Sequence, residues 1–230
     1  MPPSGLTTEE LSYWMKCERI VEGLLEELKS GGWVKTEGEW DSQAFRQMLE
    51  MTIRVNEHFN TWNSLNQLES ESKLESFLVS QKVGFTDQNA GMVWLYELLS
   101  VFLDATELFR NFLALVLKRK GSFKRSLTLG QLAKALKQEC SKFGPEFASE
   151  VDVELRNAIA HGRYWLRKAG NGSIYMSYCE ELGEVPTIRL LSEILVVIKK
   201  QALLGNCVTE TLSKKGNSGY FASVRDTSCA

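Results

Sequence analysis

The stretch that decides the fold reads ELRNAIAHG and covers residues 154–162 of the 230-residue chain. On a helical wheel, at about 100° per residue, its apolar side chains fall on one stripe that continues back towards Pro145. The sequence therefore predicts a helix over about 145–161. Its core stripe consists of Phe147, Val151, Leu155, Ala158 and Ile159. Gly162 frees the chain to leave the helix.

Three polar residues of this stretch, Arg156, Asn157 and His161, lie off the core stripe. Asn157 and His161 are one turn apart, so a hydrogen bond between their side chains is feasible. Two structural roles stay open: Arg156 pairs with Asp152 one turn earlier, or His161 interacts with the carbonyl end of the helix. Spacing alone favours these structural roles. However, small apolar residues lie on the same side of the helix as Asn157, which favours a surface that a partner covers.

Helical periodicity extends over most of the chain and predicts an all-α bundle. The predicted helices cover about 8–30, 41–62, 87–120, 128–143, 145–161 and 187–212. Before the last helix, aromatic runs on both sides of the Gly170–Gly172 turn predict one β-hairpin. We expect an N-terminal helical extension over 1–85, a helical domain over 86–212 and a disordered tail over 213–230.

The composition excludes several classes of protein. Hydrophobic residues make up 43% and charged residues 24%, which are globular proportions. Five cysteines without C-x-x-C spacing and only two histidines predict a cytoplasmic protein without a metal site or cofactor. No run approaches the roughly 18 apolar residues of a membrane span, and no secretory signal is visible, so we expect no membrane partner.

Charge is divided unevenly along the chain. Residues 1–85 carry 8 basic and 14 acidic residues, a net charge of −6. Residues 86–230 carry 19 basic and 15 acidic residues, a net charge of +4. The C-terminal part is therefore the better candidate for binding a polyanion, although an ordinary solvated surface explains the same surplus.

Arg-Asn, three residues and then His-Gly, in this order of helices and with a hairpin following, resemble the HEPN superfamily. Its signature is an arginine and a histidine separated by a short spacer, with a polar residue commonly beside the arginine. Here these residues are Arg156, Asn157 and His161, and the spacer has four residues. The run Thr-Leu-Gly-Gln-Leu at 128–132 is also similar to members of that group. The resemblance covers about residues 86–212.

The resemblance implies a helical domain that dimerises and brings two copies of the motif to one cleft. Many such proteins are metal-independent endoribonucleases, often in toxin–antitoxin or antiviral systems. Others have lost catalysis and act as interaction modules, and this alternative stays open. We therefore expect Arg156, Asn157 and His161 to be catalytic, RNA to be the substrate, and the partners to be a second copy and an antitoxin or regulatory protein.

Two further groups of residues are candidates for this site. The possible RNA-binding residues are Lys118, Arg119, Lys120, Arg163, Arg167 and Lys168. Solubility of helix ends and loops explains them equally well. Possible supporting polar residues are Asp104, Glu107 and Glu154, for which a hydrogen bond inside the bundle is the alternative. We expect His58, the other histidine, to be structural or exposed.

Overall fold

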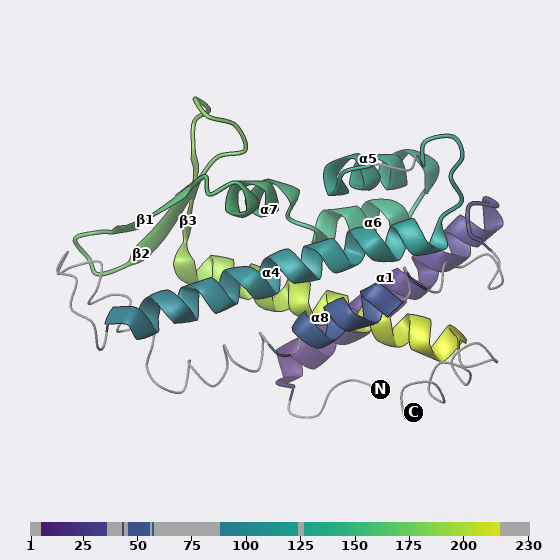
Figure 1. The fold of residues 1–230 in the computed structure, drawn as a ribbon, viewed down its shortest axis with the longest axis horizontal. Helices are drawn as coiled ribbons and strands as arrows, with labels where there is room; N and C mark the ends of the chain where they lie inside the picture. Colours follow the sequence, from purple (N-terminus) through teal and green to yellow (C-terminus); the bar gives the residue numbers. More distant parts are fainter. Residues whose placement is uncertain are drawn as a thin grey trace. The chain divides into compact units, whose positions relative to one another are not determined.

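The computed structural model describes residues 6–35, 43, 46–55, 57, 88–123 and 127–216. This part of the chain is mostly helical and carries a small antiparallel sheet, in agreement with the predicted helical bundle and hairpin insertion (Figure 1). The helices are α1 (Thr8–Ser30), α4 (Gln88–Val116), α5 (Leu129–Glu139), α6 (Phe143–Glu150), α7 (Val153–Ala160) and α8 (Leu191–Gly216). Among these residues, no helix combines the length and the apolar character that crossing a bilayer requires.

The chain forms two compact units that do not follow one another in sequence. The first unit takes in residues up to 52, residues 106–151 and residues from 203 onwards. The second unit takes in residues 53–105 and 152–202. Helices α4 and α8 therefore contribute residues to both units.

Only part of the predicted second helix is described, where residues 46–55 are helical. The predicted first residue of this helix, Asp41, its predicted end near Trp62, and His58 lie outside the described residues. The disordered tail was predicted from residue 213, but α8 continues to Gly216, and residues 217–230 lie outside the described residues.

In the first unit, helix α1 packs against α6. Its first turn carries a capping box, in which Thr7 and Glu10 each bond the backbone N–H of the other. Its buried residues recur at helical spacing as Trp14, Cys17, Ile20, Val21, Leu24, Leu25 and Leu28. A Cβ atom on Gly23 would lie 2.5 Å from the Phe143 ring, so the absence of a side chain allows the close approach of the two helices.

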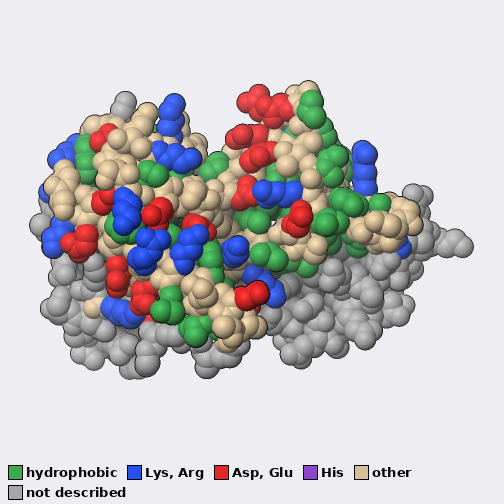
Figure 2. Space-filling view, turned by 180° about the vertical axis from the view of Figure 1, so that it is seen from behind, with side chains coloured by type: hydrophobic (Ala, Val, Ile, Leu, Met, Phe, Trp, Pro, Cys, Tyr) green, Lys and Arg blue, Asp and Glu red, His purple; other side chains and the backbone are tan. Residues whose placement is uncertain are grey.

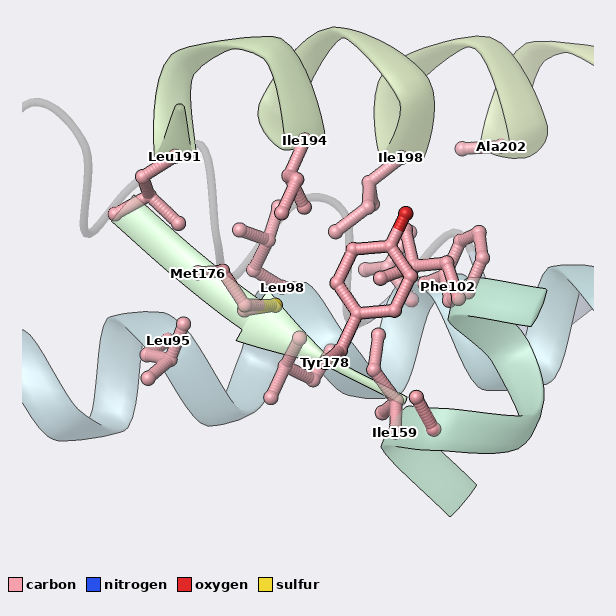
Figure 3. Close-up of a cluster of buried hydrophobic side chains, with 14 residues drawn as sticks. Leu95, Leu98, Phe102, Ile159, Met176, Tyr178, Leu191, Ile194, Ile198 and Ala202 are labelled. Atoms are coloured by element: carbon pink, nitrogen blue, oxygen red, sulfur yellow. The ribbon is translucent and has the colours of Figure 1, made fainter. Parts of the chain in front are cut away.

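In the second unit, a three-stranded antiparallel sheet has the order β1 (Tyr164–Lys168), β2 (Ile174–Tyr178), β3 (Thr187–Leu190). Its core is a cluster of buried side chains from α4, α7, α8 and the sheet. Figure 3 shows Met176 and Tyr178 of β2 between α4 and α8, with Ile159 of α7 beside them. Because side chains alternate between the two faces of a strand, Met176 and Tyr178 both enter this core and hold the hairpin against the helices.

The structure corrects two predictions about the helices. Residues 145–161 are not one helix, because the chain is extended at Val151 (φ −99°, ψ 112°) and Asp152 begins a new helix. Phe147 and Val151 are buried, but they belong to the first unit and do not share a stripe with Leu155. The last helix does not begin at the predicted residue 187: Thr187 begins β3, and α8 starts at Leu191.

The Glu27 carboxylate of α1 caps the N-terminus of α6. It accepts hydrogen bonds from the Ser141 hydroxyl and from the backbone N–H groups of Lys142, Phe143 and Gly144, at 2.8–3.2 Å. Lys142, at the N-cap position, makes no side-chain cap of its own. Partial burial acts to raise the pKa of Glu27, but these hydrogen bonds lower it below 4.5.

We predict that Glu27→Gln lowers the free energy of unfolding by about 1 kcal/mol at pH 7. The pKa of Glu27 is lower in the folded state than in the unfolded state. The contribution of this carboxylate to stability is therefore complete above the unfolded pKa near 4.5 and is lost as the pH falls through the folded pKa. The difference between wild type and variant, measured by urea denaturation, therefore shrinks as the pH falls below 4.5. Glu22→Gln, an exposed change on the same helix, is the control. A difference that does not change with pH would contradict the role of the charge.

Candidate functional site

The motif lies on α7, a short helix with its own N-cap. The Oδ1 atom of Asp152 accepts a hydrogen bond from the Leu155 backbone N–H at 3.0 Å. As predicted, Leu155, Ala158 and Ile159 are buried. Because these three residues anchor one side of the helix, the polar residues between them are turned away from the core.

The other carboxylate oxygen of Asp152 connects α7 to the sheet. Its Oδ2 atom pairs with Nη1 of Arg189 in β3 at 2.7 Å. The first turn of α7 is therefore linked to a strand that is distant in sequence. The ion-pair partner of Asp152 is Arg189 and not Arg156, which was one of the alternatives. Glu154, a predicted supporting residue, accepts a bond from the Thr187 hydroxyl of β3 at 2.7 Å.

Arg156 and Asn157 contact each other and a residue that was not predicted. Arg156 donates from Nη1 to Oδ1 of Asn157 at 3.2 Å. Asn157 donates from Nδ2 to Oε1 of Glu180 at 2.8 Å. Within the described residues, the side chain of Asn157 thus bonds Arg156 and Glu180, and the feasible bond to His161 does not form. Arg156 and Asn157 are both half-buried.

His161 is exposed at the C-terminal end of α7. The chain leaves the helix through a Schellman motif, in which the N–H of Gly162 bonds the Ile159 carbonyl and the N–H of Arg163 bonds the Ala158 carbonyl. Gly162 has φ +64°, a left-handed conformation that glycine adopts without steric cost. This termination leaves the imidazole accessible one turn after Asn157.

The register of the hairpin brings Glu180 to the motif. Tyr164 pairs with Tyr178, so the residues before β1 lie opposite those after β2. The Cys179 N–H bonds the Arg163 carbonyl at 3.2 Å, and the Arg163 guanidinium bonds the Glu180 carbonyl. Counting outwards from the turn at Gly170–Gly172 could have placed 179 and 180 beside 162 and 163. No sequence motif marks Glu180 itself.

The predicted basic residues divide between the two units. Arg163 is half-buried and holds the Glu180 backbone, whereas Arg167 and Lys168 are exposed roughly 13–17 Å further along the strand. The remaining three, Lys118, Arg119 and Lys120, belong to the first unit. There Lys120 lies over the Trp33 ring, with Nζ 4.9 Å from the ring centroid.

The predicted acidic supports also divide between the units. Asp104 is half-buried in the second unit, on α4. Glu107 belongs to the first unit and forms an ion pair with Arg110 one turn later on the same helix. Among the described residues, no group of three or more His, Cys, Asp and Glu side chains is arranged to hold a metal ion.

Comparison with protein-family models, with curated proteins and with solved structures gives no match for this chain.

We predict that Asp152→Ala lowers the free energy of unfolding by about 2 kcal/mol, because it removes both the cap of α7 and the ion pair with Arg189. Asp152→Asn keeps one oxygen for the cap but places an NH2 donor towards Arg189, so it should lose only the ion pair and cost about half as much. Urea denaturation followed by circular dichroism measures both variants. Two variants as stable as wild type would show that this carboxylate does not set the start of α7.

Proposed function

We propose that this protein is a metal-independent endoribonuclease of the HEPN type that acts as a homodimer. The observation that carries the proposal is the arrangement at the end of α7, where the Arg156 guanidinium, the Asn157 amide and an exposed His161 imidazole follow one another within two turns. The hairpin and the final helix α8 come next in the chain, in the order that the resemblance implies.

The residue types suit RNA cleavage that uses no metal. The 2′-hydroxyl loses its proton as its oxygen attacks the adjacent phosphorus, and the 5′-oxygen leaves with a proton from an acid. Imidazole titrates near neutral pH and can take either role. The arginine fork is permanently charged and matches phosphate oxygens. Each chain has one motif histidine, so an acid and a base of this type require two chains.

The alternative is a non-catalytic interaction module, and one observation favours it. The loop after β2 carries Glu180, Glu181 and Glu184, all exposed, and Glu180 bonds the motif itself. Figure 2 shows acidic side chains gathered on a projecting part of the surface. Negative charge beside the motif disfavours a polyanion and suits a protein partner, such as an antitoxin or a regulatory protein.

We predict that His161→Ala and Arg156→Ala each abolish cleavage of a mixed RNA pool and leave the thermal melting temperature within a few degrees of wild type. The matched controls are His58→Ala, which removes the other histidine, and Arg54→Ala, which removes an exposed arginine. EDTA should not change the rate. Loss of activity on chelation while the fold survives contradicts the metal-free mechanism. Wild-type protein that cleaves no RNA, while motif variants lose a partner in a pull-down, supports the interaction module instead.

A second prediction tests whether two chains form one site. When equal amounts of wild type and His161→Ala exchange subunits, about one quarter of the dimers contain two wild-type chains. If cleavage needs both histidines, the mixture retains about one quarter of the activity rather than about one half. The measurement is initial rate at constant total protein, with a mixture of wild type and His58→Ala as control. Retention of half the activity would show that each chain acts alone.

A further inference from the structure

We infer that Glu180 is a positioning residue of this site, which holds the Arg156 guanidinium in place through the amide of Asn157. The inference rests on the proposed function, because it concerns the residues that would contact RNA. It depends on a chain of two hydrogen bonds, 2.8 Å from Asn157 Nδ2 to Glu180 Oε1 and 3.2 Å from Arg156 Nη1 to Asn157 Oδ1.

The chemistry of the two ends determines the orientation of the amide between them. A guanidinium can only donate hydrogen bonds, and an ionised carboxylate can only accept them. Asn157 satisfies both only when Oδ1 faces Arg156 and Nδ2 faces Glu180. A flipped amide would place two donors against each other and two acceptors against each other. The carboxylate therefore selects the orientation in which Asn157 receives the arginine.

The backbone of Glu180 is held from the other side of the hairpin. Arg163 donates from its guanidinium to the Glu180 carbonyl, and the adjacent Cys179 N–H bonds the Arg163 carbonyl. Cys179 is buried. The carboxylate thus extends from an anchored strand end, which limits the positions that the Asn157 amide can take.

This connection bears on catalysis because arginine is a long side chain with much rotational freedom. Holding it before the substrate binds removes part of the entropy cost of reaching the transition state. The carboxylate also places a negative charge near the position of a phosphate, which weakens RNA binding. Glu180 should therefore support kcat through its oxygen and raise KM through its charge.

Three variants separate these effects. Glu180→Ala removes the acceptor and the charge, and Glu180→Gln keeps an acceptor oxygen and removes only the charge. Glu181→Gln removes the neighbouring charge on the same loop and is the control. We expect Glu180→Ala to lower kcat about tenfold on a single-stranded RNA, and Glu180→Gln to retain kcat within about twofold and to lower KM. Equal kcat for Glu180→Ala and Glu181→Gln, with wild-type melting temperatures, overturns the inference.

NMR of the 15N-labelled protein without RNA distinguishes this inference from the proposed function. In wild type, the Asn157 side-chain NH2 and the Arg156 guanidinium should give shifted signals, assigned by their loss in Asn157→Ala and Arg156→Ala. Glu180→Ala should move both signals and Glu181→Gln neither. Wild-type protein that cleaves no RNA contradicts the proposed function. Signals that do not respond to Glu180→Ala overturn the positioning role, whether or not RNA is cleaved.

Discussion

The arrangement of α7 and β3 in the second unit depends on a single carboxylate, that of Asp152, because each of its two oxygens makes a different structural contact. Its Oδ1 atom caps α7 and its Oδ2 atom pairs with Arg189 of β3. The cap determines the residue at which the helix begins, and the buried residues Leu155, Ala158 and Ile159 determine which side faces the core. Together they leave Arg156 and Asn157 half-buried and His161 exposed. A helix that continued unbroken from α6 would lack this cap.

The site is built from three kinds of local structure that meet at the end of α7. The helix supplies the arginine and the amide, the Schellman motif leaves the imidazole exposed, and the hairpin supplies Glu180. The carbonyl and the guanidinium of Arg163 both bond the residues that follow β2 and hold them in place. Since the cation, the amide and the anion form one chain of hydrogen bonds, each position depends on the other two.

Charge near the motif has two opposite consequences for function. The guanidinium suits a phosphate, whereas the exposed glutamates after β2 repel one. The basic residues at 118–120 belong to the first unit, and one of them is already engaged by Trp33. Under the proposed function, phosphate binding within the second unit therefore depends on Arg156 more than on a wide basic surface. The same glutamates would suit a protein partner with basic side chains, as in the alternative of an interaction module.

Local pattern was enough to predict many elements of this protein. The helix over 8–30, the start of a helix near residue 128, the burial of Leu155, Ala158 and Ile159, and the turn of the hairpin depend on residues a few positions apart, so periodicity and side-chain chemistry reveal them. The polar character of the Arg156 face followed from the same wheel.

Contacts between distant residues were decided only by the tertiary structure. The helical pattern continues across Val151, and the break that separates α6 from α7 is accompanied both by the local cap of Asp152 and by its ion pair with a residue 37 positions away. Strand β3 lies where the first residues of the last helix were expected, because pairing with β2 satisfies its backbone. Glu180 reaches Asn157 across 23 residues by the register of the hairpin. Such hydrogen bonds depend on where the chain folds back, and a period read along the sequence carries no information about that.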